Sequence, residues 1–186
     1  DYREAAGRIA VQVHGATVEK NLGTDTRLKV EGVLDAIAGA TPTGEPAPEG
    51  SDQVPLAKLT ERRRAWNATL ARQFSVGSLT LGAGRSLESD YDSVGWSVNG
   101  LAEFNQKNTT LLVGVAGTSD EVRVFHRKEW ENKRSLDVIA GVTQLLDPRA
   151  TVTLNLTWGR ASGYLADPYK LVQKNTEVIP GVFLPL

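Results

Sequence analysis

The chain contains two histidines, which are the residues best suited to acid–base catalysis near neutral pH. His126 lies in a charged segment, and a hydrolase could pair it with one of three residues close in sequence, Asp120, Glu121 or Ser119. A histidine in a solvated loop is the more ordinary arrangement. We therefore predict no catalytic residues and no enzyme, and keep a barrel enzyme with a rim site near His126 as an alternative.

The acidic run 88–92 offers oxygen ligands of the kind that calcium takes, but it lacks the spacing of a recognised calcium loop. We interpret it as an acidic surface loop and predict no metal site. The absence of cysteine excludes cysteine nucleophiles, thiolate metal sites and disulfides. No segment carries the features of a cofactor site, and we predict no cofactor.

Charge and hydropathy bound the class of protein. Lysine plus arginine number 21 against 22 acidic residues, so there is no basic excess for nucleic acid. No apolar run approaches the roughly 18 residues that a spanning helix needs, so membrane insertion would have to use strands. A chain without methionine or a signal peptide is expected to be one domain over 1–186 that is incomplete at both ends.

Alternation of apolar and polar residues with a period of two is the strongest signal in the sequence. Segments such as 79–87 and 152–158 alternate, and they belong to stretches of roughly 10–13 residues, the length that crosses a bilayer when tilted. The fold class predicted is all-β, an antiparallel up-and-down transmembrane β-barrel with about eight strands in this part of a larger barrel. The strands are expected near 8–20, 26–38, 62–74, 78–88, 93–104, 109–119, 134–146 and 150–162.

The connections between these strands differ in length in a regular order. Short turns rich in Gly, Asn, Asp and Pro follow the odd strands, at 21–25, 75–77, 105–108 and 147–149. Most connections after the even strands are longer, as at 39–61 and 120–133. Outer-membrane barrels sort turns and loops in this way, which would place both ends of this chain on the outer side.

Two faces follow from the alternation. The first strand is expected to place Ile9, Val11 and Val13 on the apolar face, and the second Leu28, Val30 and Leu34. The opposite face would line a lumen, with the candidates His14, Arg27, Lys29, Glu31, Asp35, Asn67, Glu88, Asn99, Glu103, Asp137 and Asn155. A soluble β-rich binding module would show the same alternation with its apolar face inward, and it stays open as an alternative.

Five aromatic residues share the parity of the apolar positions in their strands. They fall near the strand ends or in the outer half, as the girdles at two membrane interfaces would require. These predicted interface residues are Trp66, Phe74, Trp96, Phe104 and Trp158.

Several motifs are familiar, in order: Asp35–Pro42 (DAIAGATP), Glu88–Tyr91 (ESDY), Gly141–Pro148 (GVTQLLDP) and Ser162–Lys170 (SGYLADPYK). The chain resembles a bacterial family that carries only a domain-of-unknown-function label and is predicted to form an outer-membrane β-barrel. The resemblance implies a barrel with further strands and brings no catalytic residues. The motifs lie at loop bases, where their side chains could tie loops to the rim: Asp35, Asp90, Tyr91, Asp167 and Tyr169.

The function expected is that of a non-enzymatic, porin-like channel, or of a scaffold or sheath around an envelope partner, in the outer membrane of a Gram-negative bacterium. Outer-membrane lipid is the expected partner, and no nucleic acid. The family resemblance further implies a small lipoprotein or an envelope redox protein as a partner.

Overall fold

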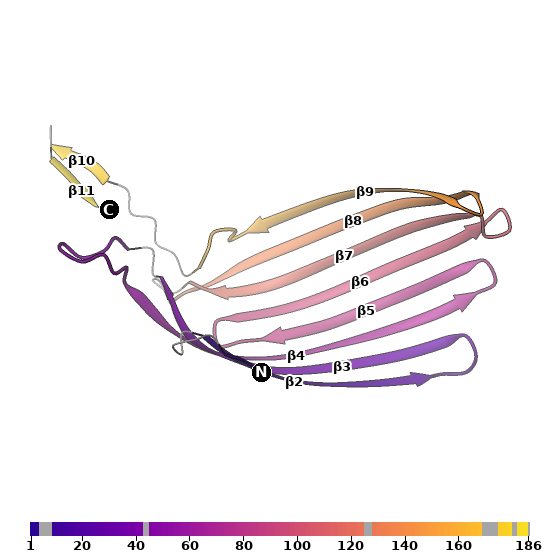
Figure 1. Cartoon of the computed structure of the whole chain (residues 1–186), viewed down its shortest axis with the longest axis horizontal. Coiled ribbons are helices and arrows are strands. Elements are labelled where there is room, and N and C mark those ends of the chain that lie inside the picture. The colour runs from indigo at the N-terminus through magenta and orange to yellow at the C-terminus, as the bar shows by residue number, and fades with distance from the viewer. Residues whose placement is uncertain (4–8, 43–44, 125–127, 169–174, 180–181, 186) are drawn as a thin grey trace.

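The computed structural model describes residues 1–3, 9–42, 45–124, 128–168, 175–179 and 182–185, and its regular structure there is entirely β. Nine strands form one antiparallel sheet in which every strand pairs with its neighbours in sequence (Figure 1). They are β1 (Tyr2–Arg3), β2 (Ile9–Asn21), β3 (Thr26–Pro42), β4 (Leu56–Phe74), β5 (Gly77–Leu87), β6 (Tyr91–Phe104), β7 (Thr109–Arg123), β8 (Trp130–Asp147) and β9 (Ala150–Gly163).

The predicted all-β class and the eight long strands are confirmed by β2–β9. Two of these strands begin earlier than expected, β4 at Leu56 and β8 at Trp130. The short β1 was not predicted, nor was the separate hairpin of β10 (Asn175–Ile179) and β11 (Val182–Pro185). The sheet is not closed into a barrel, because β1 and β9 are its two edges and do not pair with one another.

The short turns are confirmed, and they lie at the opposite end of the sheet from the other connections. The long connections predicted at 39–61 and 120–133 are shorter than expected, because β3, β4, β7 and β8 extend into them. Turns at 22–25, 75–76, 105–108 and 148–149 lie at one end of the sheet, and the connections at 43–55, 88–90 and 124–129 lie at the other, the loop end (Figure 1). The turn between β2 and β3 uses Gly23 at a φ of 89°, which glycine adopts without strain. As expected, β2 begins and β9 ends at the loop end (Figure 1).

Strand register defines the two faces. Residues paired across an antiparallel ladder lie on the same face, so one row runs from strand to strand across the sheet. We call the side that carries this row the apolar face and the opposite side the polar face. The row comprises Leu28, Leu70, Leu81, Val98, Val115, Val138 and Trp158.

The predicted faces of β2 are wrong. Ile9, Val11 and Val13 lie on the polar face, because Val13 pairs with Asp35 and Val11 with Ile37. His14 pairs with Leu34 and lies on the apolar face, so its assignment to the polar face is wrong. The strong alternation of β3 sets the phase of β2 through the pairing, and this overrides the local pattern of residues 9–13.

Among the residues whose burial is described, the buried hydrophobic side chains are Val122 and Val124, both at the loop end. The large side chains of the apolar face are exposed instead, among them Val113, Leu154 and Leu156 at 57–68%. The sheet therefore buries little of its apolar surface against itself. No helix long and apolar enough to cross a membrane occurs in the described part of the chain.

Candidate functional site

The polar face is built from glycines that lie opposite polar side chains. In five directly paired positions, a glycine on one strand faces an Asn, Asp or Ser on the next: Asn67–Gly84, Gly82–Ser97, Asn99–Gly114, Gly141–Asn155 and Asp137–Gly159. A Cβ at each of these glycines would come within 3.1 Å of the opposing side chain. The polar side chains thus lie flat over glycine instead of standing out from the sheet.

This arrangement leaves space above the middle of the polar face. A cavity of about 350 Å³ lies over β4–β8, and its polar-face lining is mostly small. The lining includes Ala65, Gly82, Gly84, Ser97 and Ala116. A surface of this kind accommodates water or another chain closely, because no large side chain rises from it.

Nine of the eleven predicted lumen residues lie on the polar face as expected: Arg27, Lys29, Glu31, Asp35, Asn67, Asn99, Glu103, Asp137 and Asn155. Glu88 follows β5 in the loop, and His14 lies on the apolar face. The charges pair along this face, with Lys29 Nζ 2.8 Å from Glu31 Oε1 and Lys107 Nζ 3.2 Å from Glu103 Oε2. Neighbouring charges of opposite sign largely neutralise each other.

The first predicted loop-base residue, Asp35, lies inside β3 and not at a loop base, because β3 continues to Pro42. Asp35 on β3 accepts two hydrogen bonds from Arg63 on β4, from Nη2 at 2.7 Å and from Nε at 3.0 Å. The Asp35 side chain is only 11% exposed, so the two-pronged ion pair is partly shielded from water. The ion pair joins β3 to β4 within the sheet, and the pairing of the two strands continues beyond it to Pro42 and Leu56.

The second predicted loop-base motif is held by a residue that the sequence did not suggest. Glu61 on β4 accepts a hydrogen bond from the Ser89 backbone N–H at 2.7 Å and another from the Ser89 hydroxyl at 2.6 Å. Glu61 therefore clamps the connection between β5 and β6. Glu61 and Ser89 are 28 positions apart in the sequence, and no local pattern predicts their contact.

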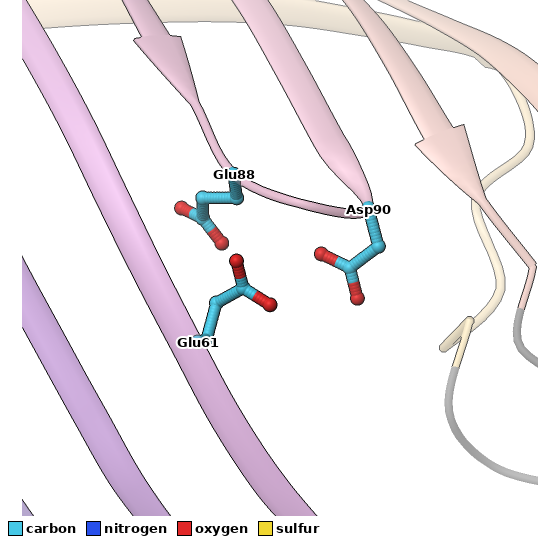
Figure 2. A group of neighbouring side chains, drawn as sticks. All are labelled: Glu61, Glu88 and Asp90. Atoms are coloured by element: carbon cyan, nitrogen blue, oxygen red, sulfur yellow. The ribbon is translucent and has the colours of Figure 1, made fainter.

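The clamp brings three carboxylates together. Glu61, Glu88 and Asp90 point toward one another from β4 and the 88–90 connection, and each offers an oxygen within 4.8 Å of the others (Figure 2). Burial, reinforced by the negative charge of Glu61, raises the pKa of Glu88. Oxygen donors of this type suit calcium, although three carboxylates supply only part of the shell that calcium takes.

Tyr91 and Asp120 continue the network on the polar face. Asp120 is 3% exposed and accepts hydrogen bonds from Ser93 Oγ at 2.6 Å and Thr118 Oγ1 at 3.2 Å. Tyr91 also hydrogen-bonds to Asp120. The structure thus gathers Asp35, Asp90 and Tyr91 at one end of the sheet.

The candidate catalytic set is divided by the strand. Asp120 pairs with Ser93 on the polar face, whereas Ser119 pairs with Val94 and Glu121 with Asp92 on the apolar face. A site at the rim could therefore combine His126 with Ser119 and Glu121 on one face or with Asp120 on the other, but not with all three, and it stays a prediction. His126 and Tyr169 lie outside the described residues, and Asp167 lies in the segment after β9.

The five predicted interface aromatics all lie on the apolar face and are 45–56% exposed. Trp96 lies in the half of β6 nearer the loop end, and Phe74 and Phe104 end their strands at the turns. Trp66 lies just past the middle of β4 toward the turn end, because β4 begins at Leu56 and not near residue 62 as predicted. The sheet therefore carries aromatic side chains at two levels of one exposed apolar face.

These features define an all-β protein whose long antiparallel strands separate an exposed apolar face from a polar, glycine-rich one. The chain belongs to the family described as "Protein of unknown function (DUF3570)", whose model matches residues 1–133 and 124–178. Comparisons with the curated proteins and with the solved structures found no match.

Proposed function

We propose that this sheet is part of the wall of a transmembrane β-barrel in a bacterial outer membrane, with lipid against its apolar face. The observation that carries the proposal is the exposure of that face. Val122 and Val124 are the buried hydrophobic residues of the part whose burial is described, while long rows of Leu, Val and Trp remain open. Soluble proteins rarely expose apolar patches of such extent.

The spacing of the aromatic residues supports a membrane. Trp66 and Phe74 are eight positions apart on β4, as are Trp96 and Phe104 on β6. At about 3.3 Å per residue, this spacing is about 26 Å along the strand, or about 20 Å along the axis of a barrel whose strands tilt by about 40°. The apolar band of outer-membrane barrels is about 25 Å tall, so the two levels fit its interfaces.

Closure needs partners for the edges of the sheet. Backbone N–H and C=O groups along the free edge of β9 would have no hydrogen-bond partner in hydrocarbon, where water is absent. Further strands must therefore lie between β9 and the opposite edge. We propose that strands of a longer chain supply them, since closed barrels of this type are usually built from one chain.

The lumen of such a barrel would be lined by the polar face. Its glycines and flat-lying Asn, Asp and Ser side chains leave the cavity of about 350 Å³ over β4–β8. Small side chains cannot fill a barrel wider than eight strands, so water fills the remaining space. We therefore favour a non-enzymatic, porin-like pore.

Conductance across a planar bilayer, measured on the full-length protein, tests the pore. Steady open conductance is the expected result, and Asn99→Lys on the polar face should shift its ion preference toward anions. The matched variant Val98→Thr, on the apolar face of the same strand, should leave the ion preference unchanged.

Two other outcomes would change the proposal. Insertion without conductance would replace the pore with a sheath around a partner, of which a small lipoprotein or an envelope redox protein is the kind to seek. Failure to insert would overturn the membrane assignment and favour a soluble binding module.

A further inference from the structure

A second feature of the apolar face is a shallow groove at the middle of β2, β3 and β4, beside the end of β5 at Leu87. Its volume is about 360 Å³, and it lies across β2, β3 and β4. Ala16 and Gly32, directly paired, form the small-residue floor, and Trp66 continues the same row as one wall. A Cβ built on Gly32 would meet no atom within 4 Å, so the floor is open.

The groove becomes polar in the next row of paired residues toward the loop end. His14, Leu34 and Arg64 pair across β2, β3 and β4, and all three line the groove. In the opposite direction, the next row is Val18, Val30 and Ala68, and Val18 is 68% exposed. The groove thus joins an apolar surface on one side to a cationic group on the other.

β4 carries four cations on this face: Arg72 lies near the turn end, and Lys58, Arg62 and Arg64 lie in the half nearer the loop end. Lys58, Arg62 and Arg64 share the apolar-face parity with Trp66, and all three are exposed. None of them forms an ion pair with a described residue. Arg85 on the neighbouring strand provides a contrast, because its guanidinium is already bonded to Asp92 at 2.6 and 3.0 Å.

We propose that this groove binds an anionic membrane phospholipid, its acyl chains lying over Val18 and Val30 and its phosphate on Arg64 and Arg62. The inference rests on the proposed function, because it requires the apolar face to lie in lipid. Residues two apart on a strand lie about 7 Å apart, so the two guanidinium groups can reach one phosphate. Arginine binds phosphate through two parallel hydrogen bonds, and Trp66 lies at the level where tryptophan contacts headgroups.

Charge complementarity selects this occupant over a neutral lipid or an acidic protein. Three unpaired cations beside an exposed apolar surface match a molecule that carries phosphate and hydrocarbon together. An acidic peptide would meet the arginines but would leave the apolar row uncovered. The ion-paired Arg85 adds little, because Asp92 already neutralises it.

The experiment measures retained lipid on the full-length protein by native mass spectrometry, with phosphatidylglycerol and phosphatidylcholine as probes. Wild-type protein should prefer phosphatidylglycerol. The double variant Arg62→Gln with Arg64→Gln should reduce this preference about fivefold for each arginine removed. Arg72→Gln is the matched control on the same strand and face, at the turn end where the guanidinium lies 5.4 Å from the Phe74 ring, and it should keep the preference.

A second variant tests the groove without changing charge. Gly32→Leu fills the floor and should lower occupancy by phosphatidylglycerol. Flotation with phosphatidylcholine vesicles reports membrane insertion separately. Failure of the wild type to float overturns the proposed function. Flotation with an unchanged lipid preference in the double variant, or unchanged occupancy in Gly32→Leu, overturns the lipid site alone.

Discussion

The two faces of the sheet are made by alternate residues of the same strands, yet they differ in the size and packing of their side chains. On the apolar face, large side chains such as Leu70 and Trp96 stand exposed. On the polar face, glycines such as Gly84 and Gly114 make room for the side chain directly across from them. The sheet therefore carries its rows of large apolar side chains on one face and its glycines on the other, which suits a wall that curves around the glycine-rich face.

The difference also shows which interactions hold each face. Hydrogen bonds and ion pairs, such as Asp35–Arg63, Glu61–Ser89 and Ser93–Asp120, tie the polar face together at the loop end. The apolar face is held chiefly by the backbone ladder, because its side chains bury little against one another. In the membrane that we propose, hydrocarbon would cover this face without disturbing the ladder.

A charge placed on each face gives the largest expected effect. Leu70→Arg lies midway between Trp66 and Phe74 and should lower the free energy of unfolding in lipid by about 2–4 kcal/mol. Thr69→Arg, one residue earlier on the polar face, should lower it by less than about 1 kcal/mol, since its charge can stay hydrated. Urea unfolding from phosphatidylcholine vesicles measures both.

Equal losses in the two variants would contradict the assignment of the faces. A larger loss in Thr69→Arg would reverse it and place the polar face against a packed interior.

Methyl groups added to two glycines test the close approach on the polar face. A Cβ at Gly84 would lie 2.8 Å from the Trp66 backbone oxygen and 3.1 Å from Asn67 Oδ1. Backbone cannot move aside cheaply, so Gly84→Ala should destabilise the protein by about 1–3 kcal/mol. Gly32→Ala, on the apolar face with open space around it, should be neutral or stabilising by about 0.5–1 kcal/mol.

The same unfolding measurement compares the two alanine variants. If Gly84→Ala is as stable as Gly32→Ala, the glycine–polar pairs do not set the curvature of the polar face.

The sequence pattern within each segment predicted the features that depend on neighbouring residues alone, namely the strands and the short turns. The pleat alternates side chains, and turns require particular residues, so the eight long strands and their short turns followed from sequence alone. Pairing between strands is not local, and what depends on it was missed. The phase of residues 9–13, the placement of His14, the glycine–polar pairs and the approach of Glu61 to Glu88 all depend on register.

The smallest expected effect lies where the polar face meets the loop end. Glu88 has a raised pKa in the folded protein, from burial first and then from Glu61. Its ionised form is therefore less favourable in the fold than in the unfolded chain. The contribution of Glu88 to stability is fully present below the pKa of the unfolded chain and is lost as pH rises through the raised, folded pKa.

Glu88→Gln removes this charge and should make the protein slightly more stable near neutral pH, with a flatter decline in stability as pH rises from about 4 to about 7. Asp92→Asn is the matched control, because the pKa of the half-buried Asp92 is lowered by its bond to Arg85. Its loss should lower stability near neutral pH instead. Unfolding midpoints of both variants are measured across this pH range. A gain of stability in Glu88→Gln and a loss in Asp92→Asn would support a strained carboxylate cluster at the loop end. A loss of stability in Glu88→Gln would mean that the ionised carboxylate stabilises the loop.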